Sequence, residues 1–343
     1  MAVTAATLSS IALMIAYPHK SSLAQTPTPF YLLERLTDDL GGPRIWIKRD
    51  DLTGAATSGN KIRKLEFLLA EALAQGCDTV ITSGGVQSNH CRAVALLGAQ
   101  LGLKVHLLLR SDSEPQPVGN LLLDHLAGAT ISHYSVREFK RLDSLFNQWC
   151  DHYLQQGRKA YTIPTGGSNG TGIWGYISAA GELAEDFARY NLKPQAIVHA
   201  TGSGGTQAGL MLGCHLHGID TSVKAYAVCD SSAYFERKVS VDLKEWQEKY
   251  SPTTDIGTLK AYTCDSYIGP GYGQADAEVF EFIKQLAAME GIILDPVYTG
   301  KAFYGLVEDI KKGKYASGEN SDIVFIHTGG LFGLFAQQQA LGY

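Results

Sequence analysis

The sequence predicts an α/β fold in which helices cover both faces of parallel β-sheets. Short apolar runs alternate with stretches of helical period along nearly the whole chain, which is the pattern of repeated strand–helix–strand units. The chain has 343 residues, of which 45% are hydrophobic, so it is long enough for one large domain or two ordinary ones. No fixed-period repeat or low-complexity linker divides it, so any domain boundary has to follow from topology.

The apolar runs and the helical periods define the expected elements in chain order. Strands are expected over 44–48, 79–83, 104–110, 130–135, 160–164, 196–202, 224–229, 291–295 and 322–328. Helices are expected over 60–75, 89–101, 118–127, 171–190, 206–217, 275–289 and 300–312. In the first of these helices, Ile62, Leu65, Leu69 and Leu73 lie on one stripe, as an amphipathic helix requires.

Charge and cysteine usage exclude several classes of protein. A net charge of −5 and a pI of about 6.1 provide no basic surface for nucleic acid or an anionic membrane. No apolar run approaches the roughly 18 residues of a membrane span. The six cysteines form no CxxC pair, which indicates reduced thiols in a cytoplasmic protein, with no disulfide framework and no metal site. The mildly apolar residues 1–20 lack a basic start, so we expect an N-terminal arm or helix; the alternative is an organellar targeting segment.

A glycine-rich segment, "TGSGGTQAG" at 201–209, stands between an expected strand and an expected helix. Such a loop directs backbone N–H groups toward an anion at a helix N-terminus and therefore suits a phosphate group. It is neither the GxGxxG fingerprint, because Gln207 takes the third glycine position, nor a P-loop. The alternative is a glycine-rich turn that binds no ligand.

Three further polar clusters follow expected strands, where ligands bind in α/β folds. In "SGGVQSNH" (83–90), Ser88 and Asn89 either cap a helix or hold a carboxylate. The segment "IPTGGSN" (163–169) is either a hinge or part of a site. Near the C-terminus, Tyr298 and Thr328 are expected to end buried strands, and the alternative for Tyr298 is a core aromatic residue. Lys301 is expected on a solvated helix face.

Lys61 stands at the start of the expected helix 60–75, where the helix dipole disfavours an ammonium group. A neutral imine nitrogen would avoid that penalty. Together with a phosphate loop, a carboxylate-type loop and hydroxyl groups at strand ends, such a lysine indicates pyridoxal phosphate as the cofactor.

The same motifs resemble those of a known family. "IWIKRDDLTG", "SGNKIRKLEFL", "GGVQSNHCRA", "YTIPTGGSN", "GSGGTQAG", "GYG", "DPVYTGKA" and "FIHTGG" are similar to segments of the fold-type II pyridoxal-phosphate enzymes. Within them, the chain resembles the D-cysteine desulfhydrase / 1-aminocyclopropane-1-carboxylate deaminase family over residues 28–336. The resemblance implies two open, twisted, mostly parallel sheets, as in the tryptophan synthase β-subunit. It also implies a small domain over 62–172, a large cofactor-binding domain over 1–61 and 173–343, and a homodimer.

The resemblance also implies how the cofactor is held. Lys61 matches the family's Schiff-base lysine, and Lys64 matches a lysine that assists the phosphate, with a plain surface charge as the alternative. The residues that match the phosphate loop are Gly202, Ser203, Gly204, Gly205 and Thr206.

The remaining matches surround the cofactor ring and the substrate. Asn89 matches the residue beside the ring oxygen, and Ser88 matches the one beside the substrate carboxylate. Tyr298 and Tyr272 match tyrosines near the substrate's α-carbon, and Thr328 falls where a residue faces the pyridine nitrogen.

One departure within the family predicts the reaction. The deaminase pattern has Glu after the tyrosine of "DPVY" and Leu after the histidine of the last strand, where this chain has Thr299 and Thr328. A threonine hydroxyl leaves the pyridine nitrogen largely neutral, which weakens the electron sink but suffices when a thiolate leaves. The expected activity is therefore that of a lyase, a D-cysteine desulfhydrase that converts its small amino-acid substrate to pyruvate, ammonia and hydrogen sulfide. The alternatives are 1-aminocyclopropane-1-carboxylate deaminase, L-cysteate sulfo-lyase and a cofactor-binding protein without turnover.

Overall fold

The computed structural model describes residues 15–113, 115–318 and 321–342. Most of the expected N-terminal arm or helix, residues 1–14, lies outside this part of the chain. From Ile15 onward, an extended segment runs along the second helix, where the Ser21 N–H donates to the Glu66 carbonyl at 2.9 Å.

The larger of two sheets has six strands in the order β1-β2-β10-β7-β8-β9. Their bounds are β1 Phe30–Leu32, β2 Arg44–Lys48, β7 Ala196–Thr201, β8 Ser222–Ala227, β9 Tyr262–Cys264 and β10 Asp322–Ile326. All neighbouring pairs are parallel except β1 with β2. The smaller sheet has the order β5-β4-β3-β6 and is wholly parallel. Its strands are β3 Thr79–Gly85, β4 Lys104–Arg110, β5 Thr130–Tyr134 and β6 Ala160–Thr162. Two mostly parallel sheets are therefore confirmed.

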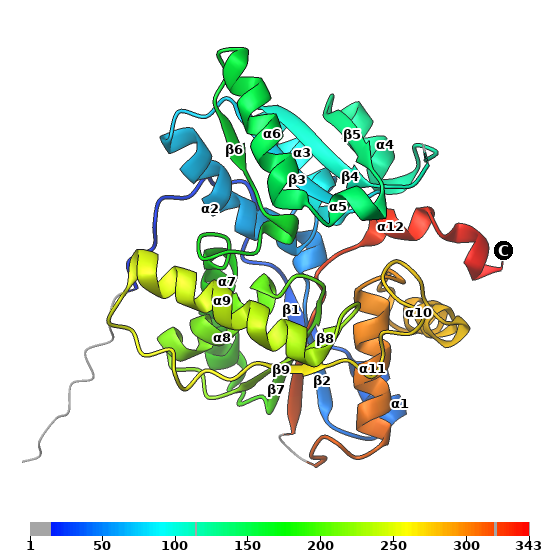
Figure 1. The fold of residues 1–343 in the computed structure, drawn as a ribbon. Helices are drawn as coiled ribbons and strands as arrows, with labels where there is room; N and C mark the ends of the chain where they lie inside the picture. Colours follow the sequence, from blue (N-terminus) through cyan, green and yellow to red (C-terminus); the bar gives the residue numbers. More distant parts are fainter. Residues whose placement is uncertain (1–14, 114, 319–320, 343) are drawn as a thin grey trace, which may run out of the picture.

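Helices cover both sheets, and Figure 1 shows the four-stranded sheet above the six-stranded one. The helices are α1 Glu34–Leu40, α2 Asn60–Ala74, α3 Asn89–Gln100, α4 Gly119–Leu126, α5 Val136–Phe139, α6 Leu142–Gln155, α7 Trp174–Tyr190, α8 Gly205–His217, α9 Ser232–Tyr250, α10 Ala277–Glu290, α11 Thr299–Lys311 and α12 Leu331–Phe335. Short 3-10 turns are η1 Asp50–Leu52, η2 Thr165–Gly167 and η3 Gln338–Leu341. Helix α2 packs against α3 near the small sheet and against α7 beside the large one.

The large sheet has an apolar core on each face. Along β7, Ile197 packs with α7 and α8 on one face, while Ala196 and Val198 pack with α10 and α11 on the other. A strand that is buried on both faces reads as a continuous apolar run, which is why β7 could be predicted from the sequence. No helix in the described residues is both long and apolar enough to cross a membrane.

One expected strand is wrong. Residues 291–295 form no strand in the structure, although Ile292 and Leu294 are fully buried. They fill the core beside α10 and α11 without pairing with another strand. A short apolar run reports burial, which a loop can also satisfy, and periodicity alone does not separate the two.

Candidate active site

A glycine turn docks the start of α2 against the end of β10. Gly59 has φ +108°, and a Cβ atom there would lie 2.8 Å from the Thr328 carbonyl oxygen. The Asn60 N–H donates to that same oxygen at 3.1 Å. Only glycine tolerates both the backbone angle and the close approach. The turn therefore places Lys61 at the carboxyl end of the large sheet.

Burial changes the chemistry of Lys61. It lowers the pKa of Lys61 to about 8, because an ammonium group loses hydration there. The amine lies close to Gly166, where a Cβ atom would be 3.3 Å from the Lys61 Nζ. A lysine with a lowered pKa is a better nucleophile toward a carbonyl compound near neutral pH.

This pKa predicts how the protein without cofactor captures pyridoxal phosphate. The neutral amine is the reacting form, so the capture rate should rise with pH through about 8 and level off above it. Mixing cofactor with protein at a series of pH values and following the visible absorbance of the lysine-bound cofactor measures this. A rate that keeps rising toward pH 10, as for an ordinary lysine, would contradict the prediction.

The loop from Gly202 to Thr206 forms a cradle at the N-terminus of α8. Gly204 has φ +84°, and a Cβ atom on Gly205 would lie 2.6 Å from the Ser168 hydroxyl oxygen. The Gly205 N–H donates to this hydroxyl at 3.2 Å, and the Asn60 amide donates to the Thr206 hydroxyl at 3.1 Å. The first N–H groups of a helix have no partner within the helix, so this end attracts an anion such as a phosphate.

Lys64 lies behind this cradle, not in front of it. Its ammonium group donates to the Gly166 carbonyl and to the Ser168 hydroxyl, both at 3.2 Å. Only 1% of the residue is exposed, which excludes a plain surface charge. Burial, followed by the charge of Lys61, lowers the pKa of Lys64 well below its ordinary value.

Two adjoining pockets bring most of the predicted residues together. They share Lys61, Gly202, Ser203 and Tyr298. The smaller, with about 380 Å³ of empty space, is also lined by Asn89, Gly204, Thr206 and Thr328. The larger, with about 710 Å³, is also lined by Ser88 and Tyr272. Of the predicted residues, Lys64 and Gly205 line neither of these two pockets.

Ser88 and Asn89 combine the two interpretations that the sequence left open. Ser88 is the N-cap of α3, where its hydroxyl accepts the Cys91 N–H at 3.2 Å, and it also lines the larger pocket. The Asn89 side-chain oxygen accepts from Asn120 at 3.0 Å, which fixes the orientation of its amide. Capping thus holds this loop in place at the pocket wall.

Tyr272 and Tyr298 form a direct pair, with 2.5 Å between their hydroxyl oxygens. Burial raises the pKa of Tyr272, and burial together with Tyr272 raises the pKa of Tyr298 well above its ordinary value. Both phenols therefore keep their protons at neutral pH. The prediction that Tyr298 ends a strand was wrong. Tyr298 is the residue before α11, in a turn whose N–H groups donate to the Asp295 carboxylate.

The two threonines differ in their surroundings. Thr328, two residues after β10, lines the smaller pocket. The Thr299 hydroxyl is fully buried and donates to the Asp295 carboxylate at 2.8 Å. Of the pair, only Thr328 faces the pocket space.

The sequence prediction for Lys301 was wrong. Only 1% of this residue is exposed, and its ammonium group donates to the Ile268 and Gly271 carbonyls at 2.7 and 2.8 Å. A helical pattern does not reveal that a distant loop folds over the helix.

Sequence reasoning also missed Ser168, whose hydroxyl contacts Lys64, Ser203 and the Gly205 N–H. Its signal was present in "IPTGGSN", a segment that fits either a hinge or part of a site.

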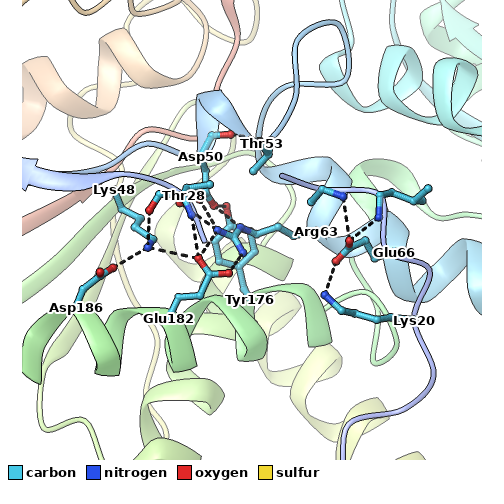
Figure 2. A network of polar contacts seen from close by, with 12 residues as sticks. Lys20, Thr28, Lys48, Asp50, Thr53, Arg63, Glu66, Tyr176, Glu182 and Asp186 are labelled. Atoms are coloured by element: carbon cyan, nitrogen blue, oxygen red, sulfur yellow. Dashed lines mark hydrogen bonds and ion pairs between the residues drawn. The ribbon is translucent and has the colours of Figure 1, made fainter. Parts of the chain in front are cut away.

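A buried ionic network supports the first turn of α2 (Figure 2). Arg63 contacts both Asp50 oxygens at 2.8 and 2.9 Å and both Glu182 oxygens at 2.6 and 3.0 Å. Lys48 contacts Asp186 at 2.6 Å on the same side of α7. Since Arg63 follows Lys61 by two residues, this network fixes the helix that carries the lysine.

These features fit pyridoxal phosphate. The cradle can accept a phosphate, and Lys61 lines the same pocket. Glycines stand where a Cβ atom would narrow this pocket: a Cβ atom on Gly202 would lie 3.1 Å from the Tyr298 ring. The family described as "Pyridoxal-phosphate dependent enzyme" matches residues 21–329, and the chain belongs to this family of fold-type II enzymes.

Within that family, the resemblance to D-cysteine desulfhydrases and 1-aminocyclopropane-1-carboxylate deaminases is confirmed. The bifunctional D-cysteine desulfhydrase/1-aminocyclopropane-1-carboxylate deaminase, mitochondrial, of Arabidopsis thaliana is 44% identical over 92% of this chain and 79% of its own length. D-cysteine desulfhydrase of Salmonella choleraesuis is 38% identical over 92% of this chain and 94% of its own. The crystal structure of a 1-aminocyclopropane-1-carboxylate deaminase homologue has a TM-score of 0.84 and 39% identity, covering 94% of this chain and 95% of its own.

Proposed function

We propose that the chain is a pyridoxal-phosphate-dependent D-cysteine desulfhydrase. D-cysteine and water would give pyruvate, ammonia and hydrogen sulfide. The observation that carries the proposal is the phenol pair of Tyr272 and Tyr298 beside the lowered-pKa Lys61 in one pocket. This arrangement provides a base for the α-proton and a neutral hydroxyl group that can hold or move a proton nearby.

Each residue in the pockets has a role in this proposal. Lys61 holds the cofactor and, once released from it, removes the α-proton. Ser88 donates to the substrate carboxylate, and the tyrosine pair lies at the α-carbon. When bound, the cofactor supplies the electron sink.

The remaining residues orient the cofactor. The cradle from Gly202 to Thr206 would bind its phosphate, with the Lys64 amine one layer behind. Asn89 would hold the ring oxygen, and Thr328 would be the residue nearest the pyridine nitrogen.

A second candidate function, 1-aminocyclopropane-1-carboxylate deaminase, is favoured by the Arabidopsis relative, which is named for both activities. A substrate panel separates the candidates. We expect pyruvate and sulfide from D-cysteine, against little 2-oxobutanoate from the cyclopropane amino acid and little sulfite from L-cysteate. Faster turnover of the cyclopropane substrate would overturn the assignment as a D-cysteine desulfhydrase. If the cofactor-loaded protein turned over none of the substrates, the conclusion would be a cofactor-binding protein without catalytic activity.

The two threonines are tested by the double change Thr299→Glu, Thr328→Leu. We expect thiol elimination to fall by at least about tenfold, corresponding to about 1.4 kcal/mol, and some ring opening to arise. Because Thr299 contacts Asp295, the new carboxylate meets a buried like charge unless a protonated pyridine nitrogen compensates it. Release of pyruvate and of 2-oxobutanoate measures the two reactions, and cofactor affinity measured in parallel shows whether that compensation fails. Unchanged elimination would make the threonines irrelevant to the electron sink.

We also propose the division into a small domain over 62–172 and a large one over 1–61 and 173–343. It is supported by the four-stranded sheet, whose strands all lie between Thr79 and Thr162. The proposed assembly is a homodimer, which sedimentation of the cofactor-loaded protein tests. A cytoplasmic location is supported by the six cysteines, all of them free thiols in the described part of the chain. Imaging of a C-terminal fluorescent fusion distinguishes it from an organellar one.

A further inference from the structure

Lys301 is a buried cation that takes no part in the proposed chemistry. It lies in the first turn of α11, three residues after Tyr298. Its ammonium group is bound by two neutral carbonyls, of Ile268 and Gly271, and burial lowers the pKa of Lys301. A charge that is buried against neutral groups contributes less to stability than a packed apolar side chain would, so a geometric role is the better explanation.

The two carbonyls belong to the segment "IGPGYG" at 268–273, which carries Tyr272. Three of its glycines have positive φ: Gly269 at +66°, Gly271 at +134° and Gly273 at +81°. Glycines in such conformations lose much backbone entropy on ordering, so the segment needs fixed contacts to keep one shape. From side chains of the described residues, the carbonyls of this segment receive two hydrogen bonds from Lys301 and one from Gln337, which donates to Gly273 at 3.1 Å; the local Gln274 N–H also donates to the Gly271 carbonyl at 3.3 Å.

Helix α11 therefore contacts this segment at two points. Lys301 binds the backbone on one side of Tyr272, and Tyr298 binds the Tyr272 hydroxyl at 2.5 Å. We propose that Lys301 is a positioning residue for the tyrosine pair: it fixes the 268–273 segment on α11 so that the Tyr272 hydroxyl stays against that of Tyr298. The catalytic consequence rests on the proposed function, whereas the fixing of the segment does not.

The test compares Lys301→Met with Lys311→Met in the cofactor-loaded protein. Lys311 lies on the same helix, is exposed and pairs only with Glu308 at 3.2 Å among the described residues, so it is a matched control. Hydrogen exchange of the amides at 269–274 should be at least about tenfold faster in Lys301→Met and unchanged in Lys311→Met. Turnover should fall about tenfold in the first variant and stay within about twofold in the second.

A double-mutant cycle separates positioning from a general structural effect. If Lys301 acts through Tyr272, Lys301→Met should cost less than about twofold further turnover once Tyr272→Phe is present. An equal further loss, or unchanged hydrogen exchange, would overturn the proposal. Should Tyr272→Phe alone retain full turnover, the proposed role of Tyr272 fails, and hydrogen exchange then decides the fixing of the segment by itself. Lys301→Leu, which also removes the donors, replaces Lys301→Met if that variant does not fold.

Discussion

Replacing Lys61 with alanine should lower turnover of D-cysteine by at least about 10³-fold, because the variant loses both the group that holds the cofactor and the base for the α-proton. Lys61 reaches both pockets, and its lowered pKa of about 8 makes it the reactive amine of this space. Two measurements follow: pyruvate release, and the visible absorbance of the lysine-bound cofactor, which should vanish. Cofactor held only through the phosphate cradle should then be removed by gel filtration.

Lys64→Met is the informative comparison for this variant. Lys64 is one turn further along α2, but its ammonium group is bound to Gly166 and Ser168 behind the cradle. The Lys64→Met change should weaken cofactor affinity but leave the absorbance of the lysine-bound cofactor intact when the cofactor is saturating. Full activity in Lys61→Ala would move the assignment to Lys64 or Lys301, although neither of them lines the two pockets.

The parts of the fold that could be predicted are those whose local pattern and tertiary role agree. Helix α8 was expected over 206–217 and is found over Gly205–His217, since a glycine turn, a capping region and a core face all mark it. The strand expected over 291–295 is absent, because a buried loop and a buried strand can have the same apolar sequence pattern. The polar helix α9 was missed altogether, although its Lys238 donates to the Ser168 carbonyl at 3.1 Å.

For the site, the sequence indicated which segments meet but not how deep each side chain lies. A plain surface charge was the alternative for Lys64, and Lys301 was expected on a solvated helix face. Their burial depends on loops 102 and 30 residues away, at Gly166 and Gly271, and no local pattern in the helix encodes those contacts. The resemblance suggested a role for Lys64 but left a plain surface charge as the alternative, and it provided no role for Lys301.

Replacing Arg63 with methionine should destabilise the protein by about 3–5 kcal/mol, because it leaves the buried Asp50 carboxylate without its paired cation. Arg63 is 2% exposed and Asp50 is fully buried. The guanidinium group binds Asp50 and Glu182 with four hydrogen bonds of 2.6–3.0 Å (Figure 2). After the change, the Asp50 carboxylate keeps two neutral hydrogen-bond donors, the hydroxyl groups of Thr28 and Tyr176 at 2.9 and 2.6 Å, and the more distant charge of Lys48. Urea unfolding of the cofactor-free proteins at pH 7 measures the difference, and Arg189→Met, on the exposed face of α7, should stay within about 0.5 kcal/mol.

The pH dependence identifies the ionic origin of this loss. Burial alone would raise the pKa of Asp50, but the Arg63 charge and the hydrogen bonds from Arg63 and Tyr176 hold it below its ordinary value. A carboxylate with a lowered folded-state pKa stabilises the protein above its unfolded pKa, near 4, and loses that contribution as pH falls through the folded value. The difference between the native protein and Arg63→Met should therefore be largest near neutral pH and shrink as the pH falls toward the lowered folded-state pKa of Asp50 in the native protein. A difference that stays constant down to the lowest pH at which both proteins fold would assign the loss to packing of the Arg63 side chain instead.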